Sequence, residues 1–395
     1  MSADSPGPLI FLVAGEPSGD MLGGRLMAAL GDKTGGAARF AGVGGERMIS
    51  EGLESLFPMG ELSVMGYVEV VPRIPRLLAR LRQTAAAARA LRPDAVVTID
   101  SPEFSFRLAR RLAGAGMPLI HYVAPQVWAH RPGRAARLPR LLDHMLALLP
   151  FEPPFFETFG LPCSFVGHPV VEEGADRGDG PAFRARHGIS PEAKVVCTLA
   201  GSRHSEVVRM LPVFGETLGL LAARFPGLRA VAPTVETVAA EVAAAAARWP
   251  VDTLVVTGRH EKHDAFAAST VALAASGTVA LELAIAGLPA VITYKANPLT
   301  VWAARRMMRV PYVSLVNLIL DRPVAPELLQ ERCRPDLLAD AVGALLADRR
   351  ARAEQSAEAR RAAELLGMGG TPPSRRAAEV VLDVIAGAAR AKPAS

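Results

Sequence analysis

Short apolar runs alternate with amphipathic, helix-like stretches along most of this chain. In the first half, the runs that read as buried strands are residues 9–14, 39–42, 95–99, 119–123 and 145–149. The alternation restarts in the second half, with runs at 195–199, 230–232, 253–256, 271–274 and 290–293. Strands that alternate with helices in this way predict βαβ units and parallel sheets, and so an α/β fold.

A stretch rich in glycine and acidic residues, 172–181, separates the two series of strands. With 395 residues, the chain is long enough for two domains of ordinary size. We therefore expect two Rossmann-like, doubly wound domains with a cleft between the carboxyl ends of their sheets. The predicted divisions are an N-terminal domain over 1–172, a linker over 173–190, a second domain over 191–340 and a strand-free helical segment over 341–395.

Composition is that of a soluble protein from a reducing compartment. No apolar stretch approaches the ~18–20 residues that a membrane-spanning helix needs. The N-terminus lacks the basic start and the long apolar core of a signal peptide. The three cysteines, Cys163, Cys197 and Cys333, stand singly among apolar neighbours, which indicates reducing conditions and no metal cluster. We therefore expect a cytoplasmic protein.

Arginines gather in two runs that contain no acidic residue. One run covers residues 73–92, and the other has a three-residue step at Arg131, Arg134, Arg137 and Arg140. Each run alone could be the solvated face of a helix, but two in one half of the chain favour an anionic partner. Nucleic acid is disfavoured because no aromatic side chains are interleaved with the arginines. The anionic partners that remain are a phosphorylated lipid and an anionic bilayer surface.

An apolar stripe lies beside the first arginine run. Apolar residues flanked by arginines are typical of an interfacial helix that touches a bilayer or holds acyl chains. A helix packed against the sheet would show the same pattern. The stripe consists of Met65, Val68, Val71, Ile74, Leu77 and Leu78, and Met210 and Leu211 could extend it from the second half.

The segment Ser276-Gly277-Thr278 joins the apolar run 271–274 to a predicted helix. The unpaired backbone N–H groups and the positive dipole end of such a helix can bind a diphosphate. Glu282 lies about one turn further on, where its carboxylate could reach two vicinal hydroxyls of a sugar. Phosphate and diol together predict a nucleotide diphosphate sugar. An ordinary βα unit with Ser276 as N-cap would explain the same residues without a ligand.

A second glycine turn, Ala200-Gly201-Ser202-Arg203, follows the strand at 195–199. Arg203 is placed to make forked hydrogen bonds to phosphate. No Asp-x-Asp pair occurs in the chain, so a metal-bridged diphosphate is not expected. Arg203 and the helix N-terminus would then stabilise the charge on a departing nucleotide diphosphate. No metal and no cofactor is predicted.

Asp100 ends the strand at 95–99, at the rim of the predicted cleft. It is the candidate general base, with Glu103 a lesser one, although an Asp before a helix is also a common N-cap. The glycine-rich turn after the first strand is neither GxGxxG nor a P-loop, and it could approach a ligand closely or be a simple tight turn. Its candidate residues are Glu16, Ser18, Gly19 and Asp20.

A loop after the strand at 119–123 supplies three further candidates for the cleft, Gln126, Trp128 and Arg131. Gln126 could bond hydroxyl groups, and Trp128 could pack against a sugar face or an acyl chain. A Trp buried under the loop is the alternative. His121, within the strand, is better explained as a core histidine than as a catalyst.

The chain resembles the lipid-A-disaccharide synthase family, glycosyltransferases of bacterial outer-membrane lipid synthesis. The matching segments run in order from residue 9 to about 335, which makes the resemblance specific. This chain departs from the common pattern with Glu103, Ser105 and His130, a change that affects acceptor contacts. The matches include Val13-Ala-Gly-Glu-Pro-Ser-Gly-Asp20, Ile99-Asp-Ser-Pro102, Leu149-Pro-Phe-Glu152, Gly201-Ser-Arg203 and Ala275-Ser-Gly-Thr278 with Glu282.

The resemblance implies a GT-B fold and a defined reaction. UDP-2,3-diacylglucosamine and 2,3-diacylglucosamine 1-phosphate would be joined with inversion into a β-1,6-linked disaccharide, with release of UDP. Asp100 would be the essential carboxylate, and UDP would be held by Arg203, Ser276, Gly277, Thr278, Glu282 and Asn317. The family also implies a position on the inner face of the cytoplasmic membrane and a homodimer that exchanges C-terminal parts. The segment 341–395 would thus pack on an N-terminal domain of either copy.

Two other functions remain open on the residues alone. A UDP-GlcNAc 2-epimerase or a different GT-B transferase would use the same nucleotide site, although the apolar stripe has no role in an epimerase. A non-catalytic module would bind the UDP-sugar without turnover, and an intact Asp100 argues against it.

Overall fold

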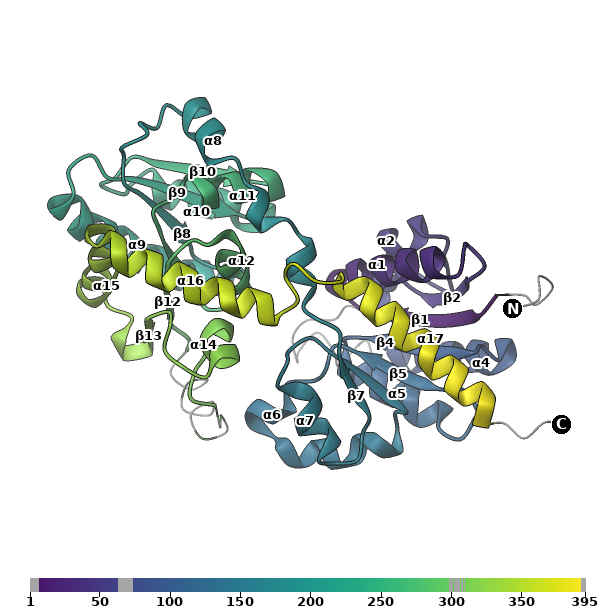
Figure 1. Cartoon of the computed structure of the whole chain (residues 1–395). Coiled ribbons are helices and arrows are strands. Elements are labelled where there is room, and N and C mark those ends of the chain that lie inside the picture. The colour runs from purple at the N-terminus through teal and green to yellow at the C-terminus, as the bar shows by residue number, and fades with distance from the viewer. Residues whose placement is uncertain are drawn as a thin grey trace. The chain divides into compact units, whose positions relative to one another are not determined.

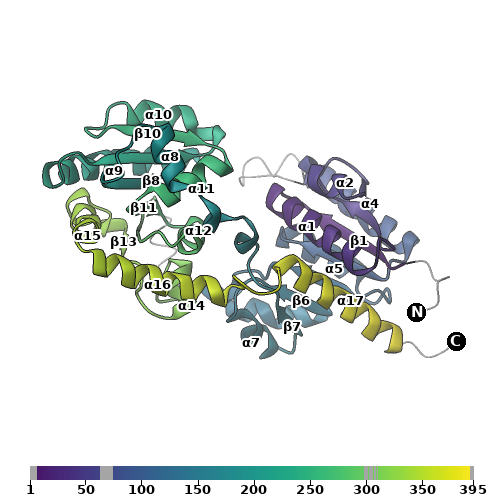
Figure 2. The ribbon, with the colours of Figure 1, turned by 45° about the horizontal axis from the view of Figure 1, so that its top comes forward.

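The computed structural model describes residues 7–62, 74–297 and 310–391, together with residues 301, 306 and 308. Contacts divide the chain into two compact units. Unit 1 comprises Met1–Pro169 and Gly370–Ser395, and unit 2 comprises Val170–Gly369. Each unit is built on one parallel sheet (Figures 1 and 2). Helices cover both faces of each sheet, because separate core clusters lie above and below it. The predicted α/β fold with two parallel sheets is therefore confirmed.

The sheet of unit 1 has seven strands in the order β3-β2-β1-β4-β5-β6-β7. Helices α1 and α17 pack on one face and α4 and α5 on the other. The strands are β1 (Leu9–Ala14), β2 (Arg39–Val43), β3 (Glu54–Ser55), β4 (Ala95–Ile99), β5 (Leu119–Tyr122), β6 (His144–Ala147) and β7 (Cys163–Phe165). The helices are α1 (Pro17–Lys33), α2 (Glu46–Ser50), α4 (Ile74–Leu91), α5 (Pro102–Leu112), α6 (Val127–His130), α7 (Glu152–Glu157) and α17 (Pro373–Ala391), with the 3-10 helices η1 (Met59–Glu61) and η3 (Pro132–Arg140).

The last helix of the chain, α17, belongs to unit 1. Its residues Ala377, Ala378 and Val381 are completely buried in the same core cluster as α1. Both ribbon views show α17 alongside α1 (Figures 1 and 2). Salt bridges reinforce the contact, with 2.6 Å between Lys33 Nζ and Glu379 Oε1. The C-terminal part of unit 1 therefore completes a core that the first residues begin.

The sheet of unit 2 has six strands in the order β10-β9-β8-β11-β12-β13. Helices α9, α10 and α15 cover one face, and α8 and α11 the other. The strands are β8 (Val195–Leu199), β9 (Arg229–Thr234), β10 (Thr253–Thr257), β11 (Val271–Ala275), β12 (Ala290–Tyr294) and β13 (Glu327–Leu329). The helices are α8 (Gly180–Arg186), α9 (His204–Arg224), α10 (Ala239–Ala246), α11 (Arg259–Ala268), α12 (Val279–Ala286), α14 (Leu315–Leu320), α15 (Pro335–Ala347) and α16 (Arg349–Leu365), with the 3-10 helices η4 (Pro169–Glu172), η5 (Ala175–Arg177), η6 (Glu236–Val238) and η7 (Gln330–Arg332).

The stretch expected to be a linker, 173–190, contains η5 and α8. Asp179 caps α8 by accepting the backbone N–H of Ala182 at 2.9 Å. The guanidinium of Arg184 donates to the carbonyl oxygens of Ser190 and Ala268, at 2.7 and 2.6 Å. These bonds fix the start of unit 2 against α11.

The apolar stripe is only partly within the described residues, since Met65, Val68 and Val71 lie outside them. Ile74 is exposed at the start of α4, and Leu77 and Leu78 are half-buried there. The proposed extension of the stripe is wrong. Met210 and Leu211 lie on α9, where Met210 is completely buried in the core and Leu211 is 6% exposed.

The first arginine run is partly neutralised by an acid from outside the run. Glu61 accepts from Arg76 and Arg80, with N–O distances of 2.8 and 2.7 Å. These hydrogen bonds lower the pKa of Glu61 to about 2. A run without acidic residues in the sequence can thus still have an acidic partner from another segment in the fold.

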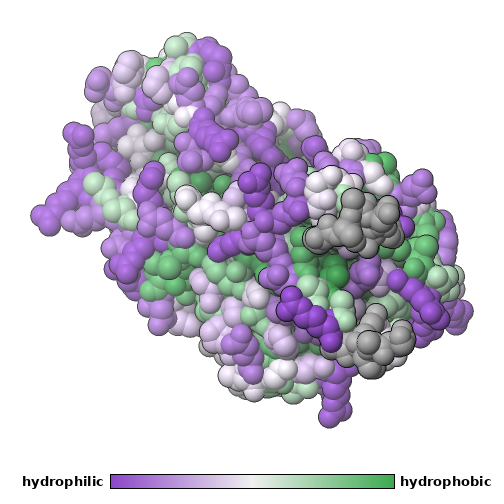
Figure 3. All heavy atoms as spheres, turned by 45° about the vertical axis from the view of Figure 1, so that its right-hand side comes forward, coloured by the Kyte–Doolittle hydropathy of each residue, from purple (hydrophilic) through white to green (hydrophobic). Residues whose placement is uncertain are grey.

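Hydrophilic residues predominate on the face shown in Figure 3, and hydrophobic residues form separate patches there rather than a continuous band. Among the described residues, no helix combines the length and the apolar character needed to cross a bilayer. The part of the chain that the structure describes therefore offers no membrane-spanning helix.

Candidate active site

The candidate residues of unit 1 lie at the carboxyl edge of its sheet. β1 is flanked by β2 and β4, so the chain leaves β1 and β4 toward opposite sides, and such a switch point is where open α/β sheets bind ligands. The glycine turn follows β1, and Asp100 follows β4. The two loops are in contact, because a Cβ on Gly15 would lie 2.7 Å from the Ser101 hydroxyl oxygen. Glycine at position 15 therefore lets the turn approach Asp100.

Unusual backbone conformations gather at this edge. Asp100 and Ser101 have φ values of 52° and 45°, in the left-handed region that residues with a Cβ avoid. Val123, directly after the neighbouring strand β5, has a φ of 81°. Three of the six described non-glycine residues with positive φ therefore stand at the ends of two adjacent strands. Strain of about 1–3 kcal/mol per residue is characteristic of functional sites.

The carboxylate of Asp100 has no partner within the described chain. Its backbone N–H donates to the carbonyl of Tyr122 at 2.9 Å, and its carbonyl accepts from the Ser105 hydroxyl at 2.7 Å. The N-cap position of α5 belongs to Ser101, and no side chain caps this helix. The structure therefore does not use Asp100 as a cap, and its half-buried carboxylate is available to a ligand.

The candidates in the glycine turn differ in availability. Asp20 is buried, and its carboxylate accepts the backbone N–H groups of Gly45, Arg47 and Met48 at 2.8, 3.0 and 3.1 Å. These bonds occupy Asp20 at the start of α2, so we assign it a structural role rather than contact with a ligand. Gly19 is buried against β4. Only Glu16 and Ser18, at the start of α1, reach the surface.

A buried glutamate that the sequence analysis did not single out holds Trp128 in place. The indole Nε1–H of Trp128 donates to Glu152 Oε1 at 3.0 Å, and its ring meets Phe151 edge-on with centroids 4.9 Å apart. The other Glu152 oxygen accepts the backbone N–H groups of Leu148 and Leu149. Burial raises the pKa of Glu152 to about 7. The sequence signal was a carboxylate shortly after a buried strand, at the end of the segment Leu149-Pro-Phe-Glu152.

The other residues near β5 fall into two groups. Gln126 and Arg131 are exposed on either side of α6. His121 is completely buried, its Nδ1 lies 2.8 Å from the Thr98 hydroxyl, and burial lowers its pKa to about 3. The interpretation of His121 as a core histidine is therefore confirmed.

In unit 2, the start of α12 is an exposed helix end. Ser276 donates its backbone N–H to the carbonyl of Thr293 at 2.9 Å, and Thr278 rather than Ser276 occupies the N-cap position. Within the described chain, no acceptor is recorded for the backbone N–H groups of Gly277 and Thr278, and both residues are exposed. This arrangement can bind an anion.

Arg203 lies at the start of α9, beside the same switch point. β8 and β11 are neighbours, so the turns that follow them share one edge of the sheet. The Arg203 side chain is 69% exposed and contacts Glu206, with 3.1 Å between Nη1 and Oε1. Gly201 has a φ of 112°, and a Cβ there would lie 2.6 Å from Glu206 Oε2. Glycine at 201 thus permits the turn that presents Arg203.

Glu282 faces α11 rather than open solvent. Its carboxylate forms an ion pair with Lys262, and its Oε2 lies 4.0 Å from His263 Nε2. The side chain of Glu282 is 12% exposed. Lys262 thus neutralises a carboxylate that would otherwise be buried without a counter-charge. Across the described residues, no three His, Cys, Asp or Glu side chains gather as a metal site would require.

Asn317 is fully engaged within its own unit. Its side-chain amide donates to the Ala325 carbonyl and to Glu327 Oε1, both at 2.8 Å, and its oxygen accepts the Ala325 backbone N–H at 2.8 Å. Contact between this buried amide and UDP would break these bonds. The direct UDP contact that the family resemblance implies for Asn317 stays a prediction, and in this structure the side chain ties α14 to the segment around β13.

Known proteins resemble the chain over nearly its full length. A family model described as lipid-A-disaccharide synthetase matches residues 10–380. A lipid-A-disaccharide synthase from Rhodospirillum centenum is 60% identical over 379 residues, which cover 95% of this chain and 94% of that protein.

Solved structures resemble the fold at low sequence identity. The calicheamicin glycosyltransferase CalG4 has a TM-score of 0.60 at 17% identity, over 98% of this chain and 100% of that chain. The UDP-GlcNAc 2-epimerase from Neisseria meningitidis has a TM-score of 0.59 at 12% identity, over 96% of this chain and 99% of that chain. A transferase and an epimerase thus share this GT-B fold, and the fold alone does not choose between them.

Proposed function

Since this chain belongs to the lipid-A-disaccharide synthase family, and so is a UDP-sugar glycosyltransferase of lipid A biosynthesis, we propose a division of that reaction between its two units. Unit 2 holds the donor UDP-2,3-diacylglucosamine. Unit 1 holds the acceptor 2,3-diacylglucosamine 1-phosphate and supplies the base. The products are the β-1,6-linked disaccharide 1-phosphate and UDP.

Asp100 is the general base in this proposal. Its carboxylate accepts the proton of the acceptor's primary hydroxyl while that oxygen attacks the anomeric carbon of the donor. The bond from the anomeric carbon to the diphosphate breaks on the opposite face, which inverts the configuration. The observation that carries this role is an unpartnered carboxylate on a left-handed backbone, at the switch point of its sheet.

The leaving group is stabilised by unit 2. Arg203 and the N–H groups at the start of α12 take up the negative charge that develops on UDP, as preorganised donors do in many transferases. Glu282 accepts hydrogen bonds from the ribose hydroxyls, and Lys262 forms an ion pair with the same carboxylate. Ser276 shapes the turn between β11 and α12, next to Gly277 and Thr278.

We also place the protein at the cytoplasmic membrane surface, as a peripheral protein. Support comes from η3, because a 3-10 helix has three residues per turn and so aligns side chains three apart. The exposed residues Arg134, Arg137 and Arg140, here called the arginine row, share one face, and Ala135 and Leu138 are buried on another. A homodimer is the assembly we propose, with α17 as the element that two copies would exchange.

The first test is UDP release from UDP-2,3-diacylglucosamine, in detergent with EDTA, with and without the acceptor. Acceptor-dependent release under chelation is the expected result, and it would support both the transfer and its independence from metal. UDP binding without release would instead favour a binding module. Conversion of UDP-GlcNAc alone would favour an epimerase.

The second test concerns the base. Asp100→Asn is expected to lower kcat by about 10²–10⁴-fold, the usual contribution of a general base, and to leave the Kd for UDP nearly unchanged. Glu103→Gln is the matched control, because Glu103 lies three residues further on, in the first turn of α5, and its side chain is 87% exposed. A similar loss in both variants, or loss of UDP binding with Asp100→Asn, would argue that Asp100 is structural.

A further inference from the structure

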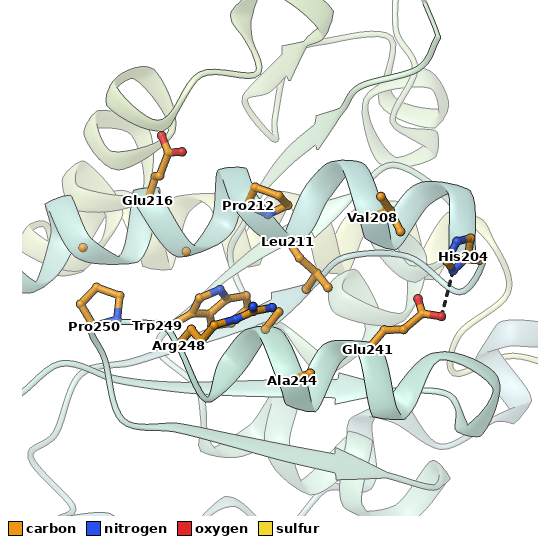
Figure 4. A pocket seen from close by; sticks show the side chains of 13 residues that line it. His204, Val208, Leu211, Pro212, Glu216, Glu241, Ala244, Arg248, Trp249 and Pro250 are labelled. Atoms are coloured by element: carbon orange, nitrogen blue, oxygen red, sulfur yellow. Dashed lines mark hydrogen bonds and ion pairs between the residues drawn. The ribbon is translucent and has the colours of Figure 1, made fainter.

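An apolar groove runs between α9 and α10 in unit 2. Figure 4 shows its two ends, with His204 and Glu241 at one end and Trp249 at the other. Val208, Leu211 and Pro212 form much of one wall, and Ala244 lies on the opposite helix. Its volume is about 780 Å³, within the range of ~300–1,000 Å³ that is typical of small-molecule sites. We call it the α9–α10 groove.

The walls of the groove leave apolar surface uncovered. Val208 is 53% exposed, which is high for a large aliphatic side chain in a folded protein. Gly215 and Gly219 on α9 add no side chains to the groove. The indole of Trp249 lies directly against Gly215, where a Cβ would come within 2.5 Å of it. Trp249 thus closes the far end of the groove.

The near end of the groove carries an unused hydrogen-bond acceptor. Glu241 Oε1 lies 2.8 Å from Nδ1 of His204. The second carboxylate oxygen, Oε2, is buried and has no partner within the described chain. A buried acceptor without a donor is costly, so a ligand with an N–H group at this point would satisfy it.

The position of that end fits one part of the donor. His204 directly follows Arg203, the residue proposed to bind the diphosphate. In the donor sugar, the carbon that carries the amide is bonded to the anomeric carbon, which carries the diphosphate. The amide N–H is therefore only a few bonds from the phosphate, and the acyl chain begins there. The second acyl chain is joined through an ester, which has no N–H to offer.

The length of the groove also fits a fatty-acyl chain. From His204 to Gly219, α9 rises by about 22 Å, at 1.5 Å per residue. The hydrocarbon core of a bilayer is about 30 Å thick, so a chain that fills one leaflet spans about 15 Å. One extended acyl chain can therefore lie in the α9–α10 groove.

We propose that the α9–α10 groove binds the amide-linked acyl chain of the donor, with the amide N–H donating to Glu241 Oε2. This inference rests on the proposed function, because it requires an acylated UDP-sugar with its diphosphate at Arg203. It gives unit 2 a way to select an acylated donor over UDP-GlcNAc. Each methylene that the groove removes from water improves binding by about fourfold.

The test fills the groove with a side chain. Ala244→Phe places an aromatic ring in it from an exposed position on α10. We expect this variant to raise the KM for the diacylated donor by about tenfold or more and to leave the Kd for UDP unchanged. The penalty should vanish for a donor with a shortened amide-linked chain and persist for one with a shortened ester-linked chain. Ala243→Phe is the matched control, on an exposed neighbouring position outside the groove.

Three results would overturn the proposal. An unchanged KM in Ala244→Phe would show that the chain lies elsewhere. A rise in KM that vanishes when the ester-linked chain is shortened would show that the groove binds the ester-linked chain instead. A change of sedimentation coefficient without any effect on the donor would identify a second copy of the protein as the occupant. Failure of the wild type to release UDP from any donor would count against the proposed function itself. The wild-type assay therefore distinguishes a failure of the proposed function from a failure of the groove proposal.

Discussion

Burial alters the ionisation of Glu152 more than hydrogen bonding does. Its pKa is raised to about 7, whereas an unfolded glutamate titrates near 4.3. Between these two pH values, the folded protein retains a proton that the unfolded chain has lost. The free energy of unfolding therefore falls as the pH rises from about 4.3 to 7. This loss of stability arises at the residue whose carboxylate holds the Trp128 indole in place.

This ionisation predicts a pH-dependent signal from Trp128. Above pH 7 the Glu152 carboxylate accepts a charge-assisted hydrogen bond from the indole, and below pH 7 the bond is weaker. As the pH rises, we expect the indole N–H resonance of Trp128, measured by NMR, to move downfield with a midpoint near pH 7. Glu152→Gln should abolish the pH dependence of the Trp128 resonance. The same substitution should raise the KM for the acceptor more than it lowers kcat.

The control for this prediction is Trp249, whose indole is on unit 2 and far from Glu152 in the sequence. Its resonance should not titrate near pH 7. A Trp128 signal that stays flat in the wild type would show that Glu152 is already charged or that the hydrogen bond is absent in solution.

Residue roles were predictable where the signal was local in the chain. Asp100 directly follows one buried strand, and Arg203 ends the short turn after another, so their place at a sheet edge could be predicted from the sequence. The tasks of Asp20 and Glu152 depend on partners in other segments, as with the bond from Met48 to Asp20. Asn317 was assigned to UDP by resemblance, and its buried hydrogen bonds to Ala325 became visible only in the structure.

At the scale of elements, η3 converts a spacing in the sequence into a surface. The sequence showed a three-residue step, but the step aligns side chains only because this segment is a 3-10 helix. Within the described residues, no acidic side chain forms an ion pair with the arginine row, whereas Arg76 and Arg80 of the first run share Glu61. Of the two runs, the arginine row is therefore the better candidate for the proposed membrane contact.

Replacing the arginine row by glutamine is expected to weaken binding to anionic vesicles by about a hundredfold, at about 1 kcal/mol for each basic residue near the surface. Co-sedimentation with phosphatidylglycerol vesicles at low and high salt would measure the effect. The control removes three exposed arginines of α16, Arg349, Arg360 and Arg361, and so makes the same change in net charge. Equal losses in both variants would indicate a general charge effect rather than a docking face.

Long buried strands were predictable, and short edge strands were not. The runs at 9–14, 95–99 and 195–199 agree with the observed strands, because strands covered on both faces are apolar throughout. The sequence analysis missed β3, β7 and β13, which have only two or three residues and show no usable periodicity. It also missed α8, since Asp179 and Gly180 at its start are typical of loops as well as of caps.

At the scale of the whole molecule, unit 1 requires α17 to complete its hydrophobic core. A chain that ends after residue 369 would leave the face of α1 that α17 covers in water. We expect unit 1 to lose at least about 3 kcal/mol of stability, as the burial of Val381 and its neighbours is lost. Hydrogen exchange should become faster in β1 and α1 and stay unchanged in β8 and α12.

Two further chains sharpen this test. Removal of residues 392–395 alone is the control and should leave exchange unchanged. Val381→Ala in the full chain is the milder variant, and it should accelerate exchange in α1 by a smaller amount if the truncated chain cannot be purified. Faster exchange in both units would mean that α17 also stabilises unit 2.

The return of the chain to unit 1 has a consequence for synthesis on the ribosome. Unit 2 is continuous, so every residue that it needs has been translated before α17 begins. Unit 1 starts first but lacks one wall of its core until the last twenty or so residues emerge. Nascent chains usually complete their domains from the N-terminus onward. In this protein the order is reversed: unit 1, which carries the proposed catalytic base, is completed last, after the whole of unit 2, the proposed donor-binding domain, has been translated.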